Sequence, residues 1–152
     1  MLEWMKDTAL TENFRFNSDN VTFDSVTAFI EAASIDEQNI HYAIADDNDE
    51  YLGTISLKSI SHLDKNAEYA IALRKAAIGT GVAFNATKLI IDIAFKELKL
   101  NKVYLNVLAE NTRAIKFYEK FGFIYEGEFK DHIFIRNKFR TLKWYAIFCG
   151  GK

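Results

Sequence analysis

The sequence predicts a single α+β (mixed α/β) domain over residues 1–152, with a mostly antiparallel mixed sheet and helices on both faces. Two patterns predict this class. The first half of the chain contains short segments that alternate apolar and polar residues, as neighbouring antiparallel strands do. The second half alternates helical and strand-like segments, as strand–helix–strand units do. With 49% hydrophobic residues, the chain can bury a substantial core.

The N-terminal segment predicts two helices. The first covers residues 2–14, and the second begins after Thr22, a residue that can cap a helix N-terminus. Apolar residues then recur at the spacing of a buried helical stripe. This stripe consists of Phe23, Val26, Phe29 and Ile30.

Three strands are predicted next, because the period of the pattern changes to two. They cover residues 40–45, 51–57 and 68–73. The acidic run 46–50 is too polar to be buried and predicts a turn, so the first two strands form a hairpin.

A long helix is predicted over residues 82–98. Its polar stripe is narrow and consists of Asn85, Lys88, Asp92 and Lys96. Because the rest of the circumference is apolar, neighbouring elements must cover this helix on more than one side.

The rest of the chain predicts three strands and one helix. A strand over 102–107 precedes a helix over 112–121, which Asn111 can cap at its start and Gly122 can end. Two strands, over 123–135 and 140–148, then close the chain.

A loop with two glycines, Gly79 and Gly81, joins the strand 68–73 to the helix that begins at Val82. Glycines allow a tight turn and the close approach of a ligand. The first amides of the helix have no partners within it and, with the helix dipole, form an anion site suited to a pyrophosphate. Taken alone, the loop is equally consistent with glycines that only shape a turn.

A second segment, residues 111–123, is an amphipathic helix that ends at a glycine. Its apolar residues Ile115, Phe117 and Phe121 suit a core position. That structural role leaves Tyr118 and Asn111 unexplained.

These two segments together resemble the GNAT superfamily of acetyl-CoA-dependent N-acetyltransferases. Gly81 and Ala83 stand at the last two fixed positions of its acyl-CoA signature, while Ile78 replaces the usual Arg or Gln and Phe84 is bulkier than usual. The second segment matches a further signature of the family closely. The matching positions are Asn111, Ala114, Phe117, Tyr118, Lys120, Gly122 and Phe123.

The resemblance implies acetyl-CoA as co-substrate. Backbone amides of the glycine loop would hold the pyrophosphate, and the end of the preceding strand would pair with the pantetheine arm. The implied loop residues are Ile78, Gly79, Thr80, Gly81, Val82 and Ala83, and the strand residues are Ile71, Ala72 and Leu73. The coenzyme site would be completed by Asn106, Asn111, Ala114 and Phe117.

Two catalytic roles are also implied. Tyr118 would protonate the leaving thiolate, which is chemically reasonable because a phenol keeps its proton at neutral pH. Glu68, at the start of the strand that leads to the glycine loop, would act as general base on the attacking amine. A solvated strand-edge carboxylate is an equally good interpretation of Glu68.

The implied reaction is transfer of an acetyl group from acetyl-CoA to a primary amine. The N-terminal segment, with Trp4, Phe14 and Phe16, is similar to branches that acetylate ribosomal-protein N-termini or nucleotide-linked amino sugars. We therefore expect a small-molecule amine, such as an amino sugar, or a protein N-terminus as acceptor. Alternatives are a non-catalytic acyl-CoA-binding protein of GNAT fold and an unrelated α+β binding module.

Composition limits the partners and the location. The formal net charge of −2 argues against nucleic-acid binding, and the single Cys149 allows no intrachain disulfide. His41, His62 and His132 are scattered and indicate no metal site. We see no signal peptide and no membrane-spanning run, so we expect a cytoplasmic protein.

The resemblance also predicts a gap in the sheet. Relatives carry a strand before the first helix, and this chain begins within that helix. We expect the resulting sheet edge to be covered by a partner subunit, as in a homodimer, or by the C-terminal segment.

Overall fold

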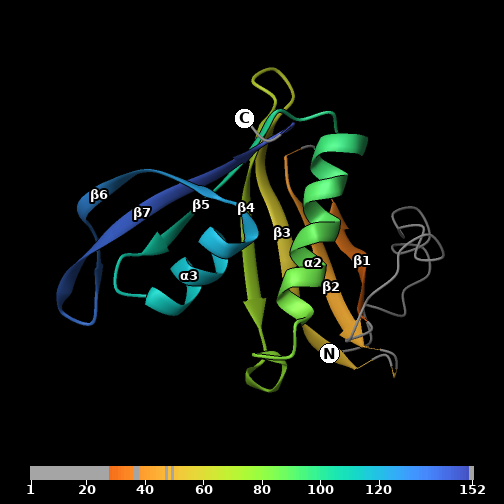
Figure 1. Ribbon diagram of the computed structural model, residues 1–152, viewed down its shortest axis with the longest axis horizontal. Helices are drawn as coiled ribbons and strands as arrows, with labels where there is room; N and C mark the ends of the chain where they lie inside the picture. Colours follow the sequence, from red (N-terminus) through yellow and green to blue (C-terminus); the bar gives the residue numbers. More distant parts are fainter. Residues whose placement is uncertain (1–27, 36–37, 47, 49, 151–152) are drawn as a thin grey trace.

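The computed structural model describes residues 28–35, 38–46, 48 and 50–150. They form a seven-stranded sheet in the order β1-β2-β3-β4-β5-β7-β6 (Figure 1). Every neighbouring pair is antiparallel except β4 and β5, which are parallel. The predicted mixed, mostly antiparallel sheet is confirmed, whereas the helix predicted over residues 2–14 lies outside the described residues.

The first four strands form an antiparallel meander. They are β1 (Ala28–Ile35), β2 (Ile40–Asp46), β3 (Tyr51–Ser61) and β4 (Asn66–Leu73). The predicted hairpin and third strand are confirmed, and β3 and β4 are longer than predicted. The turn after β2 is held by Asp46, whose carboxylate accepts from the amides of Asn48 and Glu50, each at 2.9 Å.

Strand β1 shows that the prediction of a helix carrying Phe29 and Ile30 is wrong. Phe29 lies opposite Ala45, and Ile30 lies opposite Ile44. Pairing with β2 satisfies the backbone groups along that strand's outer edge, and this tertiary gain overrides a local helical pattern. The start of the predicted stripe, at Phe23 and Val26, lies outside the described residues.

Strand β1 also bears on the expectation that a partner subunit or the C-terminal segment covers the sheet edge left by a missing first strand. The edge of β2 is covered by β1, not by the C-terminal segment, whose last strand lies between β5 and β6.

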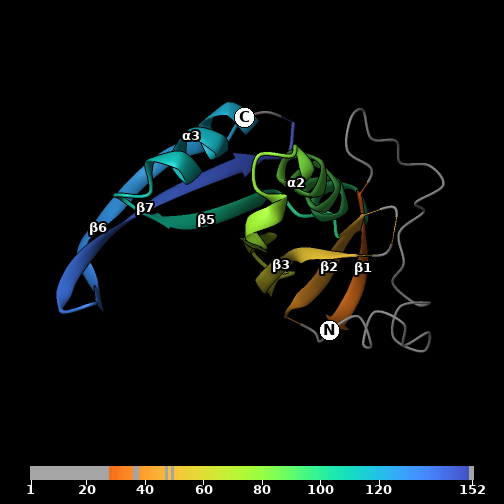
Figure 2. The same cartoon turned by 90° about the horizontal axis from the view of Figure 1, so that it is seen from below.

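One helix follows the meander, and a second follows the next strand, β5. Helix α2 (Val82–Asp92) continues into a π-helical turn, η4 (Ile93–Glu97), so that the predicted long helix is confirmed. Helix α3 (Thr112–Phe121) is capped by Asn111 and ends at Gly122, as predicted. Both lie on one face of the sheet, here called the helix face (Figure 2). Of the two helices predicted before β2, the one over residues 2–14 lies outside the described residues, and the end of the other is part of strand β1.

The C-terminal half of the sheet contains β5 (Lys102–Leu108), β6 (Ile124–Ile135) and β7 (Lys138–Phe148). Arg136 and Asn137, with φ of 53° and 61°, form the two-residue turn between β6 and β7. The resulting hairpin projects past α3 in Figure 1. Both predicted strands are confirmed.

The core lies between the sheet and α2. Its fully buried side chains include Ile55, Leu57, Val82, Ile90, Val103 and Leu105. The buried Tyr69 joins the layers, since its hydroxyl is 2.8 Å from Thr87 Oγ1 on α2.

Strands β4 and β5 separate along their length. They pair only where Asn66, Ala67 and Glu68 face Lys102, Val103 and Tyr104. Beyond these pairs, β4 and β5 run in diverging directions (Figure 1). The end of β4 therefore has no neighbouring strand on that side among the described residues, and its backbone groups there are free to bind a ligand.

Candidate active site

A pocket of about 730 Å³ opens on the helix face between the end of β4, the glycine loop, the start of α2 and helix α3. It brings together many of the residues predicted for the site. These are Ile71, Leu73, Ile78, Gly79, Gly81, Ala83, Asn111, Ala114, Phe117 and Tyr118. Two segments that lie far apart in the sequence thus form one cavity.

The glycine loop has the backbone shape that requires glycine. Gly79 and Gly81 have φ of 84° and 90°, and Gly81 is the N-cap of α2. The Thr80 hydroxyl donates to the Ala77 carbonyl at 2.5 Å, which holds the loop from within. Helix α2 carries no acidic residue in its first turn. Its N-terminal amides and dipole therefore attract an anion at the mouth of the pocket.

Two basic side chains, Arg113 and Lys120, add positive charge to the pocket. They lie on α3 at positions i and i+7, two helical turns apart, so both can point to one side. Neither was assigned to the coenzyme by sequence reasoning, although this spacing on the predicted helix could have identified them. Their charges suit the phosphate groups of a coenzyme.

Phe84 also lines the pocket and is 44% exposed. Its ring packs on Phe121 with the centroids 5.0 Å apart. The bulky residue after the glycine loop therefore links α2 to α3 and narrows the cavity.

Tyr118 forms the inner wall. Its side chain is only 9% exposed and packs between the rings of Tyr69, Phe117 and Phe123, with centroids 5.5–5.9 Å away. Burial raises the pKa of its phenol above the ordinary value of 10.0. Because this pKa is raised, the phenol is protonated at neutral pH. The structure records no hydrogen bond of the hydroxyl to any described residue, so it is able to donate to a ligand.

Asn111 has a structural role as well as a place in the pocket. Its Oδ1 accepts from the amide of Ala114 at 3.2 Å, which caps α3. The cap fixes the first turn of the helix that carries Tyr118.

Three predicted coenzyme residues, Ala72, Thr80 and Val82, do not line the pocket with their side chains. Ala72 faces away because strand residues alternate, and Val82 is fully buried in the core. The role predicted for all three is through the backbone, which these positions still allow.

Glu68 and Asn106 also lie outside the pocket, on the face of the sheet opposite the helices. Asn106 Nδ2 donates to Glu68 Oε2 at 3.1 Å. Glu68 is the last residue of β4 that pairs with β5, where it faces Tyr104. Burial, and then the negative charge of Glu68, raise the pKa of Tyr104. The predicted acid and base thus lie on opposite faces of the sheet. Both are near the place where β4 and β5 stop pairing, beyond Glu68 and Tyr104, here called the opening between β4 and β5.

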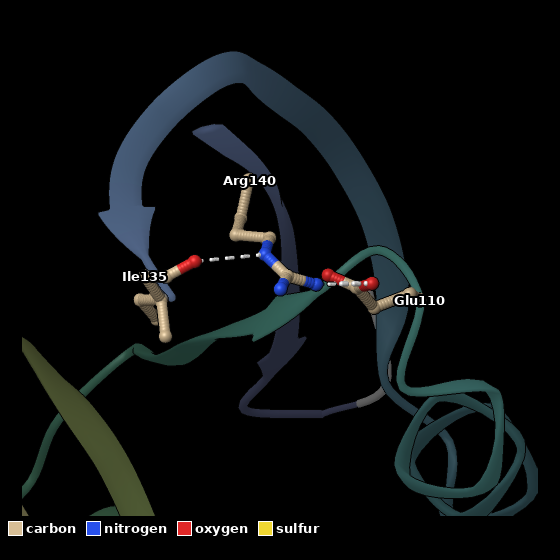
Figure 3. Close-up of polar contacts among 3 residues, drawn as sticks. All are labelled: Glu110, Ile135 and Arg140. Carbon is tan, nitrogen blue, oxygen red and sulfur yellow. Dashed lines mark hydrogen bonds and ion pairs between the residues drawn. The ribbon is translucent and has the colours of Figure 1, made fainter. Parts of the chain in front are cut away.

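An ion pair fixes the loop that leads to Asn111. Arg140 of β7 donates from an η nitrogen to Glu110 Oε2 at 2.6 Å and from Nε to the Ile135 carbonyl at 3.4 Å (Figure 3). The guanidinium lowers the pKa of the Glu110 carboxyl. One side chain therefore connects the β6–β7 hairpin to the start of α3.

In the part of the chain that the structure describes, no three His, Cys, Asp or Glu side chains gather closely enough to hold a metal ion. None of the helices described is long and apolar enough to cross a membrane.

Comparison with known proteins decides the family. The family model for the acetyltransferase (GNAT) domain matches residues 1–124. The chain belongs to this family. Spermidine N(1)-acetyltransferase of Escherichia coli K12 is 34% identical over 126 residues, which cover 80% of this chain and 68% of that protein. The Vibrio cholerae enzyme of the same name is 26% identical over 86% of this chain and 76% of its own length.

Solved structures agree with the GNAT assignment. A dodecameric spermidine N-acetyltransferase from Vibrio cholerae superposes with a TM-score of 0.72 at 28% identity. The match covers 74% of this chain and 66% of that one, so this GNAT chain spans about two thirds of that relative's length. The predicted GNAT fold and the predicted class of enzyme, an N-acetyltransferase, are confirmed. Enzymes of this family use acetyl-CoA as co-substrate.

Proposed function

We propose that this chain transfers the acetyl group of acetyl-CoA to a primary amine of a linear polyamine of the spermidine class. The observation that carries the proposal is the opening between β4 and β5. On the helix face, the pocket reaches β4 at Ile71 and Leu73, and on the opposite face Glu68 stands at the point where the strands part. In the proposed complex, the thioester would approach from the helix face, and the amine would approach Glu68 from the opposite face.

The coenzyme would bind along the pocket. The amides at the start of α2, with Arg113 and Lys120, would hold its phosphates. The free edge of β4 would pair with the amides of the pantetheine arm, as an added strand does. This places the thioester near Tyr118.

In the reaction, the amine nitrogen would lose two protons and the thiolate would gain one. Glu68, directly or through a water, takes a proton from the ammonium, and the neutral nitrogen attacks the thioester carbonyl. The carbon–sulfur bond breaks, and the thiolate takes the phenolic proton of Tyr118. The nitrogen, positively charged after the attack, gives its second proton to the Tyr118 phenolate. The N-acetylated amine and the free thiol leave, and Glu68 returns its proton to solvent, so one proton is released per turnover.

Two relatives that are spermidine N-acetyltransferases support the choice of acceptor. A polyamine is an aliphatic polycation, so a carboxylate at the acceptor side, such as Glu68, suits both its attraction and its deprotonation. The amino sugar and the protein N-terminus expected from the sequence are the competing acceptors.

The experiment is an amine panel in which thiol release from acetyl-CoA is followed for spermidine, spermine, an amino sugar and a short peptide. The proposal expects kcat/KM for spermidine to exceed that for the amino sugar and the peptide by at least about tenfold. A higher kcat/KM for the sugar or the peptide would overturn the polyamine assignment. No thiol release with any amine, despite bound acetyl-CoA, would favour the non-catalytic alternative.

We also propose that the chain self-associates through the β6–β7 hairpin, a surface different from the sheet edge at which the sequence predicted a partner subunit. Strand β6 is a sheet edge, and the hairpin exposes Phe129, Phe134 and Phe139 by 48–60%. Large exposed apolar side chains on an edge strand favour pairing with another chain. Light scattering should find an oligomer that Phe134→Glu weakens, and a monomeric wild-type protein would contradict this.

A further inference from the structure

We infer that Asn106 is a positioning residue that holds the Glu68 carboxylate at the opening between β4 and β5. This inference rests on the proposed function, because it concerns the group that takes the proton from the amine. It gives Asn106 a role different from the coenzyme contact that the sequence suggested.

The positions of the two residues support this role. Val103, Leu105 and Val107 of β5 are buried on the helix face, so Asn106 points to the opposite face. Asn106 lies two residues beyond Tyr104, the last β5 residue that pairs with β4. Its Nδ2 nevertheless reaches back across the opening to Glu68 Oε2 at 3.1 Å.

Glu68 has few other partners. In the described structure its carboxylate makes no ion pair, although Lys58 of β3 lies opposite it in the strand register. The bond from Asn106 is its one recorded side-chain hydrogen bond, and it occupies Oε2. Oε1 is therefore left to face an amine or a water.

An amide is well suited to this task. Asn106 donates without carrying a titratable proton, so it can orient the carboxylate without competing for the proton that Glu68 accepts.

A purely structural role would be to tie β4 to β5 where their pairing ends. The two roles differ in what the bond changes. A structural tie affects stability at every pH, whereas a positioning bond changes the ionisation and orientation of one carboxylate.

The first test is the pH profile of kcat/KM for Asn106→Leu with spermidine. We expect about tenfold lower kcat/KM at neutral pH. The acid limb should move to higher pH, with unchanged affinity for acetyl-CoA. Asn106→Asp, which places a second carboxylate beside Glu68, should move the limb further in the same direction. Asn101→Leu, at an exposed site just before β5, is the matched control.

An acid limb that stays in place in both Asn106 variants would overturn the inference, whatever the loss in rate. If Asn106→Leu does not fold, Asn106→Ser removes the amide with less disturbance, and the same shift is expected. If the wild type prefers another amine, the acceptor proposal fails and the profiles are measured with that amine.

A second readout does not depend on turnover. The side-chain amide resonances of Asn106 should move with pH in the wild type and stay fixed in Glu68→Gln. Resonances that do not change with pH, or that change equally in Glu68→Gln, would refute the hydrogen bond between Asn106 and Glu68. This titration decides the inference even if the wild type acetylates no amine.

Discussion

The ring of Tyr69 meets the ring of Tyr118 edge-on, with centroids 5.9 Å apart and planes at 89°. Tyr69 is fixed in turn by the 2.8 Å bond between its hydroxyl and Thr87. Since these residues come from β4, α3 and α2, one buried contact sets the position of Tyr118 relative to the sheet and the pocket. Edge-to-face pairs contribute about 0.5–1.5 kcal/mol beyond their buried area.

Tyr118→Phe should separate chemistry from binding. The phenyl ring keeps the packing against Tyr69, so acetyl-CoA should bind as in the wild type. Loss of the proton donor should lower kcat about 100-fold or more. Calorimetry with acetyl-CoA and steady-state kinetics measure the two quantities, and unchanged kcat would remove the acid role from Tyr118.

Tyr69→Phe is the matched control for that variant. It also removes one buried phenolic hydroxyl, but Tyr69 does not line the pocket. It should leave the fully buried Thr87 without its partner and lower the free energy of unfolding by about 1–3 kcal/mol. Its kcat should change far less than that of Tyr118→Phe.

Arg113→Ala and Lys120→Ala should weaken acetyl-CoA binding, because each removes a charge from the pocket. A charge-assisted hydrogen bond to phosphate is worth about tenfold in affinity. Lys116→Ala, on the same helix and outside the pocket, should bind normally. The differences should shrink as salt is raised, and a salt-independent loss would argue against a phosphate contact.

Gly53→Ala should displace the end of β4, whose other edge faces the coenzyme pocket. A Cβ on Gly53 would overlap the backbone of Ala72 and Leu73, so β4 must shift. We expect about 3 kcal/mol lower free energy of unfolding and weaker coenzyme binding.

Gly79→Ala is the contrasting variant. A Cβ at Gly79 would meet no atom within 4 Å, so the backbone strain at a φ of 84° is the only cost of the substitution. The expected cost is about 1–2 kcal/mol. Equal destabilisation by the two variants, measured by chemical denaturation, would contradict the close approach at Gly53.

The contribution of the Glu110–Arg140 ion pair to the free energy of unfolding should depend on pH. The folded-state pKa of Glu110 lies below its ordinary value of 4.5, so its stabilising contribution is present above that pH and is lost as pH falls through the folded value. A double-mutant cycle with Glu110→Gln and Arg140→Met should find coupling at pH 7 and less coupling at about pH 3. Equal coupling at both pH values would contradict the ionic bond.

Sequence patterns predicted most of the sheet, because strands 40–45, 68–73 and 102–107 combine a period of two with local turn signals. They also predicted the caps at Asn111 and Gly122, which are local chemistry. They failed at Phe29 and Ile30, whose strand conformation depends on the distant edge of β2.

Within the site, the two family signatures identified most residues of the pocket, because each signature is a short continuous segment of the sequence. The role inferred here for Asn106 escaped sequence reasoning, since its contact with Glu68 joins two strands that are 38 positions apart at that point. Arg113 and Lys120 were not assigned because basic side chains on a helix are usually solvated. The position of α3 beside the glycine loop brings both side chains into the pocket.

The central claim is acetyl transfer from coenzyme to polyamine in a single site. The most direct measurement incubates the protein with acetyl-CoA and spermidine and quantifies coenzyme A and acetylspermidine by mass spectrometry. Both products should appear in equal amounts, and the rate of formation of each should be about 100-fold or more lower in Tyr118→Phe. Coenzyme A released without acetylspermidine, or acetylspermidine formed equally fast by Tyr118→Phe, would contradict this claim.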